Sequence, residues 1–490
     1  MKCSVEEFDA IADTCYIFNA VSLLVMTINR VSVWLSLLLL SWRSAGYPSA
    51  CRTISSVCNK GIWSSRSDVD FKPDSAAVSS LKAGSWVKFI AGASNQDLPL
   101  IRNMCYLYTM TGVDCIDMSA DPAVVIVAKE GVMSAMNDLG NKHATAPLIM
   151  ISVNDDDDPH FRKAKFDAAL CPPECPRPCE KVCPAWAIPP RPVTTTGPEN
   201  TMITASNIEA ESNNLSPGVI ADRCYGCGRC VPICPLGLIS TESYTVDAAA
   251  INKLFSSGSV DAIEIHTLAN HEESFHNLWS SIGDEVLSRA KVVSVSFPNM
   301  GEKTISYLDS LQSTITSCKS WEKFQGVQIW QADGRPMSGD IGKGTAHKSS
   351  NLASYVLQEL EKLNIEENTS QIANAEMISS DRFIEVNKLN DIADIESKID
   401  VHGGFHFVQL AGGTNNYSAK TAENEGLLGA IGFGGFAFGG YARKKIGEIL
   451  HELEDLFPGS KIEDHPEILK ICLEFAENLV NSVKVVDRIV

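Results

Sequence analysis

Basic residues are too few in this 490-residue chain to balance its acidic residues. Lys and Arg number 41 against 60 Asp and Glu, which leaves a formal net charge of −19. Binding to nucleic-acid phosphates requires clustered positive charge, so this balance argues against a nucleic-acid partner. At 53.1 kDa, the chain is long enough for one large barrel or for two to three domains.

Acidic residues are absent from Thr14 to Ser67, where serines and several arginines are present. This composition is typical of an organelle transit peptide. The apolar run Val31–Leu40 is too short to span a bilayer, which takes about 20 residues. A secretory signal or a membrane anchor is the alternative, but secretion suits a chain with many free thiols poorly. We therefore expect residues 1–80 to form an organelle leader, and we expect no membrane contact after its removal.

Patterns of nucleotide binding and of catalysis are also missing. The Asp333–Thr345 loop resembles a P-loop, but Gly344 follows Lys343, where a Walker loop needs Ser or Thr. We therefore exclude nucleoside triphosphate binding there and interpret the segment as a structural loop, in which Arg335 and Lys343 are candidate anion contacts. No constellation of acid, base and nucleophile is recognisable.

Acidic and histidine side chains show no spacing typical of a metal site. Asp155–Asp158 follows an expected strand, and we interpret it as a solvated loop because nothing else supplies oxygen ligands nearby. Five histidines are interpreted as ordinary surface or helix residues, namely His143, His160, His271, His276 and His347.

Half of the sixteen cysteines gather in two short runs, each closing with Cys-Pro. The second run, Cys224–Pro235, has the spacing C-x2-C-x2-C-x3-C-P, by which bacterial-type ferredoxins hold [4Fe–4S] clusters. Gly226 and Gly228 let its backbone turn tightly and can direct amides toward the sulfurs. The first run, Cys171–Pro184, has three residues in every gap. The candidate ligands are Cys171, Cys175, Cys179, Cys183, Cys224, Cys227, Cys230 and Cys234.

Zinc is the competing interpretation, because paired C-x2-C motifs also make four-thiolate sites. Zinc sites spread their thiolates over two knuckles, whereas here a single run supplies four, which favours [4Fe–4S]. Disulfides suit such dense cysteines, flanked by Pro and Gly, less well than a metal does. In two-cluster ferredoxins the fourth cysteine of each run binds the other cluster. If the same exchange occurs in this chain, Cys183 binds the cluster of the second run and Cys234 binds the cluster of the first run.

Short apolar runs alternate with amphipathic segments along the rest of the chain. Eight strands are expected, three before the cysteines and five after them: Trp86–Ala91, Cys115–Met118, Leu148–Val153, Ala262–His266, Val292–Phe297, Val327–Trp330, Phe405–Leu410 and Gly435–Phe438. Eight strand–helix units predict an α/β fold, a closed (β/α)8 barrel. An open doubly wound sheet is the alternative.

The cysteine runs follow the third strand, so we predict a two-cluster ferredoxin-like module in the loop after that strand. Such loops form the face of the barrel at the carboxyl ends of its strands, where active sites of (β/α)8 barrels lie. Clusters there could pass an electron to a molecule bound at the barrel mouth. The expected domains are a leader (1–80), the first part of the barrel (81–165), the module (166–240), the remaining barrel (241–456, with 365–402 as a disordered insertion) and a helical tail (457–490).

Glycine-rich turns follow the last two strands and enter helices. Exposed amides at helix starts bind phosphate, and strands seven and eight commonly hold one in barrels. The alternative is that the glycines only permit tight turns. Candidate residues for a flavin or a phosphorylated ligand are Gly412, Gly413, Thr414, Gly439, Gly440 and Arg443.

Several stretches resemble the cyanobacterial light-dependent period proteins and their plant relatives. They are Trp86–Asp97, Gly112–Asp117, Asp158–Lys163, Cys171–Pro184, Asp222–Pro235, Ile329–Thr345 and Val408–Asn415. The resemblance covers nearly everything from Leu81 to Leu450 and includes the unusual spacing of the first run. It implies an iron–sulfur protein that reports cellular redox state, linked in cyanobacteria to adjusting the circadian clock to light. In plants and algae it implies a chloroplast location; a cytoplasmic one is the alternative.

Two functions follow from these patterns. The first is a redox sensor or electron carrier that holds two [4Fe–4S] clusters and signals redox state to a protein partner. The second is an oxidoreductase that uses a flavin or a phosphorylated substrate at the barrel mouth, supplied with electrons by the clusters. A purely structural role for the clusters, fastening the module to the barrel, is a third possibility.

Overall fold

The computed structural model describes residues 76–140, 145–189, 218–334, 342–359 and 406–484, which belong to one compact unit. Most of the predicted leader, Arg335 and the predicted 365–402 insertion lie outside the described residues. Among the described helices, none combines the length and the hydropathy that crossing a membrane would require.

Eight parallel strands close into a barrel in the order β1-β10-β9-β8-β7-β6-β3-β2. They are β1 (Trp86–Gly92), β2 (Cys115–Ser119), β3 (Leu148–Asn154), β6 (Ala262–His266), β7 (Val292–Phe297), β8 (Val327–Ala332), β9 (His406–Leu410) and β10 (Phe433–Phe438). Nearly every strand residue is buried, because helices cover the outer face and side chains fill the inside. The predicted barrel fold is confirmed, and the open sheet is excluded.

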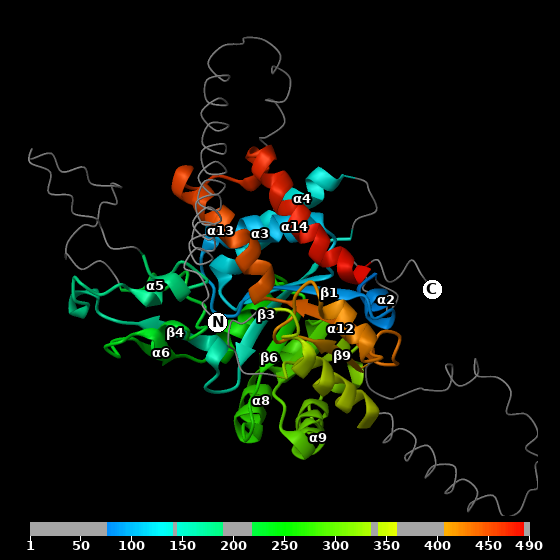
Figure 1. Cartoon of the computed structure of the whole chain (residues 1–490). Helices are drawn as coiled ribbons and strands as arrows, with labels where there is room; N and C mark the ends of the chain where they lie inside the picture. Colours follow the sequence, from blue (N-terminus) through cyan, green and yellow to red (C-terminus); the bar gives the residue numbers. More distant parts are fainter. Residues whose placement is uncertain (1–75, 141–144, 190–217, 335–341, 360–405, 485–490) are drawn as a thin grey trace, which may run out of the picture. The chain divides into compact units, whose positions relative to one another are not determined.

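Helices surround the barrel (Figure 1). They are α2 (Ala76–Lys82), α3 (Leu98–Met110), α4 (Pro122–Leu139), α7 (Ala248–Ser256), α8 (Glu272–Arg289), α9 (Thr304–Thr316), α12 (Ser418–Asn424), α13 (Gly440–Leu456) and α14 (Pro466–Lys484). Residues 347–359 are also helical. Short 3-10 turns are η1 (Pro159–Phe161), η2 (Ala168–Leu170), η3 (Gly301–Lys303), η4 (Trp321–Lys323) and η5 (Ile462–Asp464).

Helix α4 continues without interruption past an internal glycine, Gly131, to Leu139. Gly131 lies in the helix interior, and a Cβ there would come within 2.2 Å of the Arg102 carbonyl oxygen of α3. Glycine at this position therefore lets two helix backbones approach closely and does not mark a helix end.

The cysteine module occupies the connection from β3 to α7, after the third strand as predicted. Its base is an antiparallel pair, β4 (Arg162–Lys165) and β5 (Ser240–Ser243). Two short helices, α5 (Pro178–Val182) and α6 (Cys230–Ile233), each have a cysteine of the runs as their C-cap, Cys183 and Cys234. The module has its own small apolar core, separate from the barrel cores.

Candidate iron–sulfur centre and barrel mouth

Cysteines of both runs line one cavity in the module. Cys183 of the first run lies there with Cys224, Cys227 and Cys230 of the second run. We call these four residues the inner site. The rest of the lining is largely apolar and includes Ala164, Ala187, Ile188 and Val219.

Backbone geometry directs amides toward the inner-site sulfurs. The Ala164 and Ala187 N–H groups donate to the Sγ atoms of Cys224 and Cys183, each at 3.3 Å. Gly226 has φ +75°, and a Cβ there would lie 2.4 Å from the Arg162 carbonyl oxygen. The tight turn between the cysteines therefore requires glycine.

The inner-site thiols fit an iron–sulfur cluster chemically. Burial, followed by the charges of Cys227, Cys224 and Cys183, raises the pKa of Cys230 to about 12. Four thiolates in such an apolar cavity repel one another, so they need a cationic centre to stay ionised. Iron provides that charge, and the N–H donors match the sulfur-rich acceptor surface of a cluster.

We call the other four candidate ligands, Cys171, Cys175, Cys179 and Cys234, the outer site. Burial is the main cause that raises the pKa of Cys179, and the charge of Cys234 raises it further. Helix α5, which contains Cys179, contacts α6, which directly precedes Cys234. Burial opposes ionisation of Cys234, but N–H groups of Leu236–Ile239 outweigh it and lower the pKa of Cys234. The fourth cysteine of each run thus lies near cysteines of the other run.

Exposed apolar side chains adjoin the outer-site cysteines. Leu170 precedes Cys171 and is 63% exposed, and Ile233 and Leu236 flank the Cys234-Pro segment with exposures of 41% and 52%. The inner-site residues Cys224 and Cys230 are instead buried. The two sites therefore differ in their access to solvent and to other proteins.

Polar contacts connect the module to the barrel. The Arg443 guanidinium of α13 lies 4.4 Å from the centre of the Tyr225 ring. Arg223 pairs with Asp97 at 3.3 Å, and the Gln96 N–H donates to the Asp222 carbonyl at 2.9 Å. These contacts involve the residues directly before and after Cys224.

The predicted phosphate turns lie after β9 and β10, where many of their polar atoms contact the protein itself. The Thr414 hydroxyl donates to the Ala437 carbonyl at 2.6 Å, and Arg443 Nη1 donates to the Ile90 carbonyl at 2.7 Å. Gly412 has φ +57°, and a Cβ there would collide with the Asp333 carbonyl oxygen at 2.0 Å.

The other residues of these turns have similar local roles. Gly413 has φ +78°, and its carbonyl accepts from the Thr345 hydroxyl. Gly439 precedes α13, which begins at Gly440. These contacts are those of tight structural turns, and phosphate binding there stays a prediction.

The barrel interior holds a network of buried charges. Lys88 of β1 pairs with Glu264 of β6 and lies 3.7 Å from Asp117 of β2. Burial disfavours the Lys88 ammonium, but these two carboxylates outweigh it and raise the pKa of Lys88. Burial raises the pKa of Asp117 to about 6. Gln331 also donates to Glu264.

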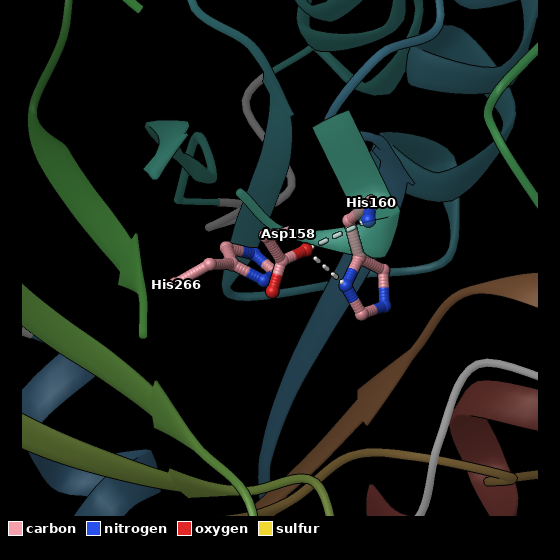
Figure 2. A group of neighbouring side chains, drawn as sticks. All are labelled: Asp158, His160 and His266. Atoms are coloured by element: carbon pink, nitrogen blue, oxygen red, sulfur yellow. Dashed lines mark hydrogen bonds and ion pairs between the residues drawn. The ribbon is translucent and has the colours of Figure 1, made fainter. Parts of the chain in front are cut away.

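Asp158, His160 and His266 come together beyond this network, at the carboxyl ends of β3 and β6 (Figure 2). Each offers one potential ligand atom, and the three atoms lie within 4.8 Å of one another. His160 Nδ1 and the His160 backbone N–H contact Asp158 Oδ1 at 2.8 and 2.7 Å. His266 Nε2 lies 3.2 Å from Glu264 Oε1.

This group corrects two predictions from the sequence. Asp156 and Asp157 are exposed as expected, but the side chains of Asp155 and Asp158 are only 0% and 3% exposed, so these two residues are not solvated. His160 is not an ordinary surface residue. Sequence reasoning missed the group because its members are far apart in the chain; the available signal was that His266 ends a strand and Asp158 follows one.

Comparison with known proteins agrees with the module's position. Residues 171–245 match the family model described as the LdpA Fe-S cluster-binding domain, and residues 254–371 and 393–482 match the Light dependent period A C-terminal domain. The chain is 36% identical over 410 residues to Light dependent period A of Synechococcus elongatus, an alignment that covers 83% of this chain and 93% of that protein.

Proposed function

The chain is an iron–sulfur protein that belongs to the light dependent period A family, and we propose that it holds two [4Fe–4S] clusters and signals redox state to a protein partner. The family match identifies the cofactor class. The number of clusters, their type and the signalling role are the proposal.

The observation that carries the proposal is the mixed origin of the inner site. Three cysteines of the second run meet Cys183 of the first run around one cavity. A fourth ligand exchanged between two runs is the arrangement of two-cluster ferredoxins. We expect Cys234 to be exchanged in the opposite direction, because α5, which contains Cys179, contacts α6, which directly precedes Cys234.

A bound cluster would supply one-electron oxidation and reduction, with a potential set by hydrogen bonds and solvent exposure. This chain's residues would tune the two sites differently. Ala164 and Ala187 donate N–H groups to inner-site sulfurs, and apolar side chains exclude water there. The outer site has the more exposed cysteines.

The outer site is the side on which we expect the partner to bind. Leu170, Ile233 and Leu236 are exposed apolar residues within two positions of its cysteines. Apolar side chains around a redox centre give a partner protein a desolvated contact close to the cluster. The partner would then exchange electrons with the outer site first, or respond to a change of charge there.

Anaerobic purification with iron and acid-labile sulfide counts tests the number of clusters. Two clusters predict about eight of each per chain, whereas one cluster predicts about four. A redox titration followed by electron paramagnetic resonance then tests sensing. Clusters that keep one oxidation state between about −600 and +300 mV would contradict the redox role, as would a colourless protein with stoichiometric zinc.

A chloroplast location is part of the same proposal, supported by the acid-free composition of Thr14–Ser67. Fusion of residues 1–80 to a fluorescent protein should direct it into chloroplasts of a plant or algal cell. A fusion that stays in the cytoplasm would contradict this part while leaving the cluster proposal intact.

A further inference from the structure

Two imidazoles and one carboxylate, with no cysteine among them, converge at the barrel mouth. The side chain of Asp158 is 3% exposed, that of His266 9% and that of His160 25%. The group is therefore nearly closed on the barrel side and reachable from solvent past His160. The carboxyl ends of barrel strands are where (β/α)8 barrels hold their ligands.

The spacing of these atoms suits a metal ion. Two neighbouring ligands bound at about 2.1 Å in octahedral geometry are separated by about 3 Å. Asp158 Oδ1 and His160 Nδ1 are already 2.8 Å apart. An ion could therefore replace their mutual hydrogen bond with little movement of either side chain. All three ligand atoms lie within 4.8 Å of one another, so a side-chain shift of His266 toward the other two would complete a three-ligand face.

Glu264 contacts His266 in the way that a carboxylate positions a metal-binding histidine. In strand β6, residues 264 and 266 point to the same side, so both side chains face the barrel interior. Glu264 Oε1 lies 3.2 Å from His266 Nε2. Such a contact fixes the tautomer and ring position of a metal-binding histidine and leaves Nδ1 as the nitrogen for the metal.

Charge balance favours a divalent ion. The buried acids Asp117, Asp158 and Glu264 face one buried lysine, Lys88. Three carboxylates against one lysine need further positive charge in a low-dielectric region, from protonated imidazoles or from a bound cation. Asp333, at the end of β8, is also close enough for its charge to interact with His160 and His266. A divalent cation would neutralise the surplus.

We propose that Asp158, His160 and His266 bind a divalent first-row transition-metal ion at the mouth of the barrel. Two histidines and one carboxylate are the ligand set that such ions, Fe²⁺ among them, occupy with coordination positions left open. Those positions face the mouth and accept water or a small ligand with oxygen donors. The site is independent of the cysteine clusters and would exist even if the chain held only one.

Manganese is the probe that separates this site from the cysteines, because Mn²⁺ prefers oxygen and nitrogen ligands to thiolates. The anaerobically purified, cluster-loaded protein is titrated with Mn²⁺, and the electron paramagnetic resonance signal of the free ion is followed. We expect about one bound Mn²⁺ per chain. Pulsed measurements on the bound ion should show coupling to imidazole nitrogen, which a surface acid cluster would not produce.

Substitutions of the proposed ligands test whether the bound Mn²⁺ lies at this site. Asp158→Asn and His266→Gln should abolish Mn²⁺ binding, because each removes a ligand. Glu264→Gln should weaken Mn²⁺ binding about 10- to 100-fold, because it removes the charge that holds the His266 ring in position. Asp157→Asn is the matched control, because this exposed acid of the same loop is no ligand and should leave binding unchanged. His160→Gln, at the most exposed member, tests the site if the buried variants fail to fold.

Two results would overturn the proposal. An undiminished free Mn²⁺ signal with the wild-type protein would mean that the three residues form only an ion-paired cluster. Binding that persists unchanged in the folded His160→Gln or His266→Gln protein would place the ion elsewhere. Neither result would affect the iron and sulfide counts that test the two-cluster proposal.

Discussion

Arg443 and Tyr225 join the barrel to the iron–sulfur module, with the guanidinium 4.4 Å from the centre of the aromatic ring. Tyr225 lies between two inner-site cysteines, Cys224 and Cys227. Arg443 is itself held by the Ile90 carbonyl, at the carboxyl end of β1. The barrel therefore supports one wall of the inner site through this buried cation, in addition to the Arg223–Asp97 pair.

Replacement of Arg443 by Met should destabilise the protein while keeping most of the apolar contact of the side chain. We expect a loss of about 2–3 kcal/mol in the free energy of unfolding, from one charged hydrogen bond and one cation–π contact. Chemical denaturation measures this. Lys444→Met, at the exposed neighbour on α13, is the control and should change stability little. Equal stability of the two variants would show that the Arg443 contact is unimportant.

Pairs of cysteine variants should reveal which thiols share a cluster. If Cys183 belongs to the inner site, Cys183→Ala with Cys227→Ala should remove one cluster and leave about four irons. Cys179→Ala with Cys183→Ala should remove both clusters, although these two cysteines belong to the same run. Iron and sulfide counts on anaerobic preparations distinguish the cases. The reverse pattern would mean that each run binds its own cluster.

Gly226→Ala should damage the inner site selectively. A Cβ at Gly226 would lie 2.4 Å from the Arg162 carbonyl oxygen and 2.9 Å from that of Pro159, in addition to the strain of φ +75°. We expect iron content to fall by about half, since one of two clusters is lost. Gly258→Ala provides a control with φ +67° and no atom within 4 Å. It should cost only about 1–2 kcal/mol of backbone strain and retain all its iron.

Acidification should weaken the module–barrel contact through His451. Burial, together with the charge of Arg223, lowers the pKa of His451 to about 4; its ring lies 5.1 Å from that of Trp186. Asp97 lies 3.8 Å from His451 but pairs more closely with Arg223.

The lowered pKa of His451 determines whether the stability of the folded protein rises or falls with pH. The unfolded chain binds a proton near pH 6.5 and the folded chain only near pH 4, so the stabilisation is present above pH 6.5 and is lost as pH falls toward 4. His451→Gln should remove this part of the dependence. Denaturation at pH 7.5 and pH 5 measures it, and parallel losses in wild type and variant would disprove it.

Local sequence patterns predicted the type of cofactor and the fold of this protein. The spacing of Cys224–Cys234 identified the cluster chemistry, because one short loop must present several thiolates to a compact inorganic core. Alternating apolar strands and amphipathic helices identified the barrel, because each buried parallel strand needs a covering helix. Both signals are contained in short stretches, which a sequence displays directly.

The sequence alone therefore determined the ligand type, the fold and the place of the module after the third strand. Only the tertiary structure decided which distant residues meet: Cys183 with the second run, Arg443 with Tyr225, and Asp158 and His160 with His266. The physical reason is the parallel pairing of barrel strands. It brings the ends of β3 and β6 together across a long inserted module, and no spacing along the chain encodes that encounter.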